Sequence, residues 1–155
     1  MDRASEVMGS MGEDAQSSVS SGYGDGYGDG YGDGEESATY WANSLDTVLC
    51  AFSKETQARA EALKSQGAVI AYWRSTASGL PANGGRGTNA KPGLIEEISG
   101  PLKICTAKAL HGTLFPPKWK GEKCWVVALM PPYQFDGDKV ASLKREFLGE
   151  APFKL

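Results

Sequence analysis

The chain has 155 residues, of which 41% are hydrophobic and 23% are charged, and its formal net charge is −3 at pH 7. This length predicts a single folded domain. No apolar run reaches the roughly 20 residues that span a bilayer and no apolar leader opens the sequence, so we expect a cytoplasmic protein with no membrane partner.

The net charge is divided unevenly along the chain. Residues 1–46 carry ten acidic side chains and one basic side chain, whereas residues 47–155 carry nine acidic and fifteen basic ones, so the two parts have net charges of −9 and +6. The positive part indicates either an anionic partner or a basic domain that is screened by its own tail.

The first 37 residues are rich in Ser, Gly, Glu and Asp and include three copies of Gly-Tyr-Gly-Asp. Such a composition cannot bury enough apolar surface to offset the entropy of ordering, so we predict a disordered acidic tail over 1–37. Helical spacing then begins, with apolar residues at Trp41, Leu45, Val48 and Phe52. The spacing predicts a helical segment over 38–67, in which Ser53 either begins a second helix or lies inside one long helix.

Residues 68–155 combine apolar runs with turn signals and predict a small mixed or antiparallel sheet. With the helix or helix pair packed on it, the predicted fold class is α+β. The expected strands are 68–73, 94–98 paired with 102–105 as a hairpin, an extended piece over 109–114 that presents His111, 124–130 at the centre of the sheet, and 144–150. We expect a long flexible loop over 75–92 and a turn over 133–138. Residues 139–150 are compatible with a helix, and the pattern slightly favours a short helical or irregular segment from 139 that leads into the last strand.

The three cysteines, Cys50, Cys105 and Cys124, are predicted to be reduced and mostly buried. Cys105, the single histidine His111 and Cys124 are spaced C-x5-H-x12-C, which lacks the close ligand pairs and the fourth ligand of a structural zinc site. We therefore expect no metal. Any of the cysteines could approach His111 for nucleophilic catalysis, although nothing in the sequence marks one as activated.

Two further patterns have alternative readings. Glu146 and Glu150 are spaced for one face of a helix and for acid–base chemistry, but the adjacent Lys144 and Arg145 favour ordinary surface ion pairs. The Gly84–Gly87 segment suits either an anion held by backbone amides or a flexible loop, and it lacks the strand–loop–helix context of a nucleotide site.

Four segments, AYWRSTASGLPANGG, GPLKICTAKALHGTLFPPKWKG, CWVVALM and DKVASLKREFLGE, appear in this order in the chain. Together they resemble an uncharacterised domain family of phage, prophage and bacterial genomes, in which a variable Gly, Tyr and Asp-rich segment precedes the domain. Gly112 stands where that family usually has alanine. The resemblance covers about half of the chain and implies a phage-associated protein of unknown activity.

Three functions are compatible with these features. The first is a non-enzymatic accessory or binding protein of phage or prophage origin, with no cofactor, whose partner is an anionic ligand, a nucleic acid or a protein of the host or phage. The second, by analogy with ADP-ribosyltransferase folds, is a small NAD-dependent transferase with Arg74, His111 and Glu146 as catalytic residues and Tyr72 and Thr113 as binding residues. The third is a nucleic-acid-binding module that uses a basic loop at Lys118, Trp119, Lys120 and Lys123.

Overall fold

The computed structural model describes residues 38–85 and 87–152. The predicted disordered tail and Arg86 of the glycine-rich loop lie outside the described residues. The chain divides into two compact units, Met1–Ala42 and Asn43–Leu155. In the first unit, residues 38–42 are described, and the rings of Tyr40 and Trp41 meet edge to face with centroids 5.0 Å apart. The second unit holds the sheet and is the subject of the following paragraphs.

The helical segment consists of two helices, α2 (Ala38–Ala51) and α3 (Lys54–Ser65). Ser53 separates them, because its hydroxyl accepts a hydrogen bond from the backbone N–H of Thr56 at 3.1 Å and so caps the start of α3. Within the second unit, apolar side chains of both helices are buried: Leu45, Val48 and Leu49 of α2, and Ala60 and Leu63 of α3. Of the two alternatives for Ser53, the structure therefore has the helix pair.

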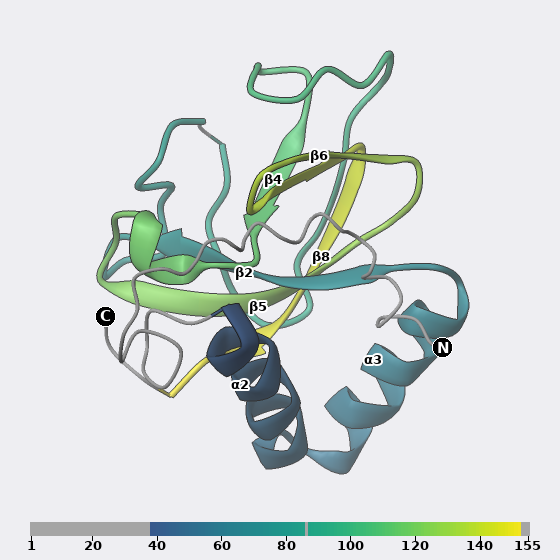
Figure 1. The fold of residues 1–155 in the computed structure, drawn as a ribbon, viewed down its shortest axis with the longest axis vertical. Helices are drawn as coiled ribbons and strands as arrows, with labels where there is room; N and C mark the ends of the chain where they lie inside the picture. Colours follow the sequence, from purple (N-terminus) through teal and green to yellow (C-terminus); the bar gives the residue numbers. More distant parts are fainter. Residues whose placement is uncertain (1–37, 86, 153–155) are drawn as a thin grey trace. The chain divides into compact units, whose positions relative to one another are not determined.

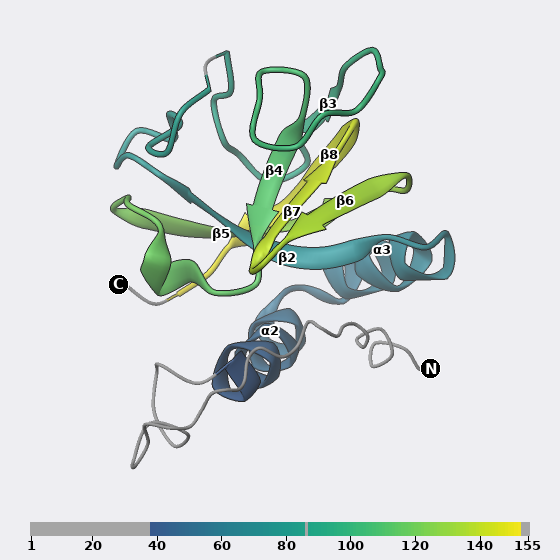
Figure 2. The same cartoon turned by 45° about the horizontal axis from the view of Figure 1, so that its top comes forward.

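Seven strands form one sheet in the order β3-β8-β5-β2-β4-β7-β6, and each neighbouring pair is antiparallel. The strands are β2 (Val69–Ser75), β3 (Ile95–Glu97), β4 (Leu110–Thr113), β5 (Lys123–Leu129), β6 (Tyr133–Asp136), β7 (Lys139–Ser142) and β8 (Lys144–Glu150), with a short 3-10 turn, η4 (Pro116–Lys118), before β5. Figure 1 shows α3 on one side of this sheet, and Figure 2 shows the loops that rise from the other side. The predicted α+β class is confirmed.

Several predicted strand assignments need correction. Residues 102–105 form a turn rather than a strand, and β3 pairs with β8 instead of forming a hairpin with them. Residues 133–142, predicted as a turn followed by a helical or irregular segment, form the β6–β7 hairpin. The apolar run at 124–130 is buried on both faces as predicted, but β2 and not β5 occupies the middle of the sheet. The last strand, 144–150, is confirmed.

Alternation of side chains across β2, β5 and β8 gives the sheet two apolar faces. One face carries Trp73, Trp125 and Phe147, whose rings meet edge to face with centroid distances of 5.1 Å (Trp73–Phe147) and 6.0 Å (Trp125–Phe147). The other face meets the helices, where a Cβ added to Gly149 would lie 3.0 Å from the ring of Phe52. Both faces are covered, which explains why β2 and β5 read as unbroken apolar runs.

The contact between β2 and β4 is narrow. Tyr72↔Thr113 is the one register pair between these strands, and at Gly112 the backbone of β4 passes so close to β2 that an added Cβ would lie 3.2 Å from the Cβ of Ala71. Beyond this crossing, the guanidinium of Arg145 on β8 donates to the backbone oxygen of His111 at 2.7 Å. The side chain of Arg145 thus joins β4 to β8, at a point where β4 has no further register pair with β2.

Candidate functional site

The predicted catalytic residue Arg74 lies at the end of β2 and is 4% exposed. Its guanidinium donates to the backbone oxygens of Pro116 and Trp119, each at 2.9 Å, and to that of Gly121. Burial lowers the pKa of this guanidinium. Three of its N–H groups therefore hold the turn before β5, and Nε has no hydrogen-bond partner among the described residues.

Glu146, the second predicted catalytic residue, lies on the helix-facing side of β8. Both of its carboxylate oxygens accept hydrogen bonds from the guanidinium of Arg59 on α3, each at 2.8 Å. This two-point pair fastens α3 to the sheet, because a planar guanidinium and a carboxylate match in geometry. Glu150, at the exposed end of the same strand, pairs with Lys123 at 3.6 Å.

His111 lies on β4 and is half-buried. Its Nε2 atom accepts a hydrogen bond from the backbone N–H of Cys105 at 3.0 Å. Burial, helped by the positive charges of Lys139 and Arg145, lowers the pKa of His111 from 6.5 to about 4. The imidazole is therefore neutral at pH 7, as its acceptor role at Nε2 requires.

The three predicted catalytic residues are thus placed in three separate sets of contacts. Arg74 contacts the turn before β5, Glu146 contacts α3, and His111 contacts the loop around Cys105. Among the described residues no hydrogen bond or ion pair joins any two of the three. The predicted binding residues Tyr72 and Thr113 are both fully buried, and the Thr113 hydroxyl donates to the carboxylate of Asp138 at 2.6 Å.

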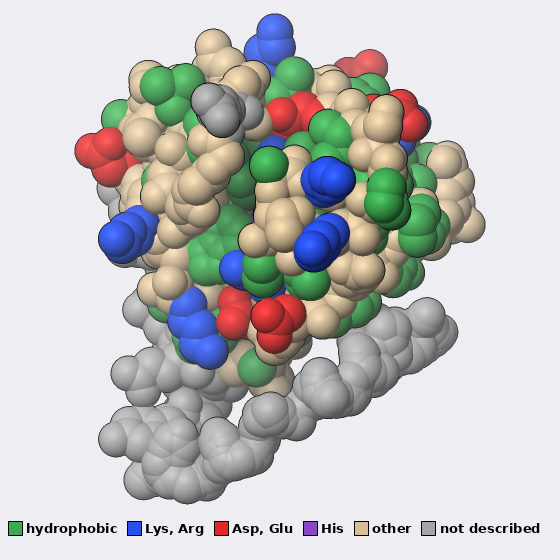
Figure 3. All heavy atoms as spheres, turned by 90° about the horizontal axis from the view of Figure 1, so that it is seen from above, with side chains coloured by type: hydrophobic (Ala, Val, Ile, Leu, Met, Phe, Trp, Pro, Cys, Tyr) green, Lys and Arg blue, Asp and Glu red, His purple; other side chains and the backbone are tan. Residues whose placement is uncertain are grey.

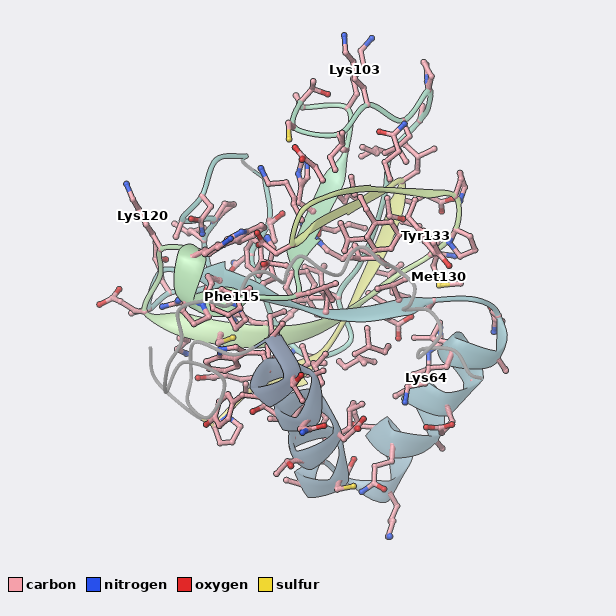
Figure 4. All side chains as sticks on the ribbon, viewed as in Figure 1. Lys64, Lys103, Phe115, Lys120, Met130 and Tyr133 are labelled. Carbon is pink, nitrogen blue, oxygen red and sulfur yellow. The ribbon has the colours of Figure 1, made fainter. Side chains whose placement is uncertain are left out.

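The predicted basic loop is largely engaged within the domain. Lys118 lies 3.6 Å from a carboxylate oxygen of Asp138, Lys123 pairs with Glu150, and the half-buried ring of Trp119 packs against the core. Lys120 is exposed and extends away from the domain in Figure 4.

A cluster of four titratable side chains, which was not predicted from the sequence, lies where the loop that precedes β4 meets the β6–β7 hairpin. We call it the thiol cluster: Cys105, His111, Asp136 and Lys139. The strand register places the last three on one side of the β4–β7–β6 sheet. His111 lies opposite Ala141 of β7, and Asp136 lies opposite Lys139 of β7. Because Ala141 and Lys139 are two residues apart on one strand, their side chains and those of their partners point to the same side.

The loop over residues 102–109 brings Cys105 onto this surface. The amide of Gln134 fixes the loop by accepting from the N–H of Ile104 at 2.9 Å, and the Cys105 N–H is fixed by His111. Cys105 itself has a φ of 66°, a left-handed conformation that is uncommon for a residue with a side chain. Its exposed sulfur lies 3.5 Å from the Nζ of Lys139 and 3.8 Å from Oδ2 of Asp136.

The same loop carries two exposed lysines. The N–H of Lys103 donates to the backbone oxygen of Lys108 at 3.4 Å, and the Thr106 hydroxyl links them further by donating to the oxygen of Lys103 and accepting from the N–H of Lys108. Figure 4 shows Lys103 at the outer end of the domain, and Figure 3, which looks onto this end, shows basic side chains over it. This end of the domain therefore carries exposed lysines, among acidic side chains, and an exposed cysteine.

One sequence signal could have located this cluster. The Gly-Asp pair at 137–138 is a two-residue hairpin turn, with Gly137 at φ 61°, and such a turn places Asp136 directly opposite Lys139. The turn was predicted, but not the strands on either side of it. The sequence analysis left open which of the three cysteines approaches His111, and in the structure it is Cys105. The prediction that the cysteines are mostly buried is wrong, because Cys50 and Cys105 are exposed.

Comparisons with known proteins found no matching family model, no matching curated protein and no matching solved structure. Within residues 38–85 and 87–152, no group of three or more His, Cys, Asp or Glu side chains is arranged to hold a metal ion. In the same part of the chain no helix has the length and apolarity needed to cross a bilayer.

Proposed function

We propose that this chain is a non-enzymatic accessory binding protein, of the phage or prophage kind that the family resemblance implies, and that it binds an acidic, extended segment of a partner protein. The proposed binding surface is the end of the domain formed by the 102–109 loop and the β6–β7 hairpin. The observation that carries the proposal is that Lys103 and Lys108, joined by a backbone hydrogen bond, are both exposed on a loop that is fixed to the sheet.

The charges at this end favour an anionic partner. Lys103 and Lys108 are exposed and form no ion pair with any described residue, whereas Lys118 and Lys123 of the other basic loop are each paired with a carboxylate. Unpaired lysines on a fixed loop keep their attraction for an incoming carboxylate, because no internal partner competes for them.

The neighbouring strand favours a peptide over a nucleic acid. β6 is an edge strand, and its outer side has no strand against it among the described residues. An extended peptide can pair with such an edge through its backbone, and the 48% exposed Phe135 would offer an apolar contact. The contacts of Arg74 and Glu146, each used inside the domain, support this proposal over the transferase alternative.

The test measures the affinity of the full chain for a labelled glutamate-rich peptide by fluorescence anisotropy. The double variant Lys103→Gln, Lys108→Gln is compared with Lys54→Gln, Lys64→Gln on α3, which changes the net charge equally. We expect the first to weaken binding about thirtyfold, since each of the two lost charges is worth about 1 kcal/mol at contact in water, and the second to leave it unchanged.

Salt and nucleic acid supply the controls. Binding should weaken as the salt concentration is raised from 50 to 200 mM, because the added ions shorten the Debye length, which is about 10 Å at roughly 100 mM. Equal loss in both double variants, or no binding of the peptide, would overturn the proposal. Tighter binding of a single-stranded oligonucleotide than of the peptide would assign this surface to nucleic acid instead.

A further inference from the structure

The three cysteines lie in three different environments. Cys124 is buried on β5, and burial raises its pKa to about 12, so its thiol is protonated and inaccessible. Cys50 is exposed on α2, one helical turn after Asp46, and its sulfur has no charged group within hydrogen-bonding distance among the described residues. Cys105 is exposed and has both a cation and a carboxylate beside its sulfur. Accessibility and charge together therefore single out Cys105.

The groups around Cys105 suit thiol chemistry. The ammonium of Lys139 lies 3.5 Å from the sulfur, where its positive charge meets an incoming anionic reagent. Oδ2 of Asp136, 3.8 Å away, is placed to accept the proton of the thiol. The backbone hydrogen bond to His111 and the contacts of the 102–109 loop hold the sulfur in place at the surface.

We propose that Cys105 is a covalent modification site that undergoes exchange with small anionic disulfides, such as those formed by thiols that carry carboxylates. Lys103 and Lys108, on the same loop, supply the positive charge that attracts such a disulfide. This inference does not depend on peptide binding, because it concerns the sulfur and not the edge of β6.

The exchange balances without a further reagent. The Cys105 thiol gives its proton to Asp136 or to water, and the sulfur then attacks one sulfur of the disulfide. The new S–S bond forms with the electron pair of the thiolate while the original S–S bond breaks. The departing thiolate takes up one proton and leaves as a thiol, so Cys105 is oxidised and one half of the reagent is reduced.

The test uses the full chain and three disulfides of different charge: oxidised glutathione, which is anionic, 2-hydroxyethyl disulfide, which is neutral, and cystamine, which is cationic. Modification of each cysteine is followed by mass spectrometry of peptides. At Cys105 we expect the fastest reaction with the anionic reagent and the slowest with the cationic one. Cys50, near Asp46, is the internal reference and should show the opposite order.

Two lysine variants with the same change in net charge locate the effect. Lys139→Met should slow the reaction of Cys105 with oxidised glutathione roughly fivefold, the factor for one charge at contact in water, and leave Cys50 unchanged. Lys120→Met, whose side chain extends elsewhere (Figure 4), should change neither rate. Thermal melts check that both variants remain folded.

The proposal is overturned if Cys50 and Cys105 react with the same charge preference, or if the two lysine variants have the same effect. If Lys139→Met does not fold, the order of the three reagents at Cys105 and Cys50 in the unaltered chain decides the question by itself.

Discussion

One identifiable contribution to the loss of stability in acid should come from His111. Its pKa is about 4 in the folded chain and 6.5 for an ordinary histidine, so the unfolded chain binds a proton over a pH range in which the folded chain does not. Because the pKa is lower in the folded chain, His111 does not affect the free energy of unfolding above pH 6.5. As the pH falls from 6.5 toward 4, this free energy decreases. The two pKa values give a loss of about 2.5 kcal/mol between pH 7.5 and pH 4.5 in full, and because solvent screens the half-buried imidazole the loss should be about 1–2 kcal/mol.

The matched variant is His111→Gln, because a glutamine oxygen can accept the hydrogen bond from the N–H of Cys105 but does not titrate. Urea unfolding at pH 7.5 and pH 4.5 gives the acid-induced loss for each protein. The wild-type loss should exceed the variant loss by about 1–2 kcal/mol, while the contributions of the carboxylates cancel in the difference.

A direct measurement is available because the chain has one histidine. Its ring proton signals in an NMR titration belong to His111 without further assignment, and their midpoint should lie well below 6.5. A midpoint near 6.5, or equal acid-induced losses in wild type and His111→Gln, would refute the reasoning that burial, Lys139 and Arg145 keep this imidazole neutral.

Three substitutions test the packing by chemical denaturation. Gly112→Ala should destabilise the domain by about 1–3 kcal/mol, because its Cβ would lie 2.8 Å from Cδ1 of Leu129; no loss would contradict the close crossing of β4 over β2. Glu96→Gln should cost roughly 3–5 kcal/mol, because it leaves the buried guanidinium of Arg145 without the carboxylate that lies 2.5 Å away, and adding Arg145→Met should recover part of that loss. Ser53→Ala should cost about 1 kcal/mol, whereas Ser53→Asp should cost little, because aspartate also caps a helix.

The parts of the fold that were predictable are those with strong local signals. The helical face of α2, the apolar runs of β2 and β5, and the strand at 144–150 follow from periodicity and length. The pairing of β3 with β8 does not, because it joins residues about fifty positions apart through the Arg145–Glu96 contact. The hairpin assigned to 94–105 failed for the same reason, since a turn signal between two short apolar runs gives no information about a more distant partner.

The candidate site was predictable only in part. His111 was singled out because it is the one histidine, but the residues that set its pKa come from β7 and β8 and are not its neighbours in the sequence. Arg74 was proposed as a catalytic residue by analogy with ADP-ribosyltransferase folds, and that analogy carries no information about its contacts. In the folded chain the backbone oxygens that it holds are provided by Pro116, Trp119 and Gly121, more than forty positions away.

The narrow junction between β2 and β4 has a consequence for motion. β4, β7 and β6 are joined to one another by eight register pairs, whereas β4 meets β2 through one. Local opening should therefore separate these three strands together from the rest of the sheet, and it would have to break the hydrogen bond from Arg145 to the backbone oxygen of His111. In hydrogen exchange, amides at the junction would lose protection together while those inside the three-stranded unit kept theirs. Because His111, Asp136 and Lys139 all lie on that unit, the surroundings of the Cys105 sulfur would persist through such an opening.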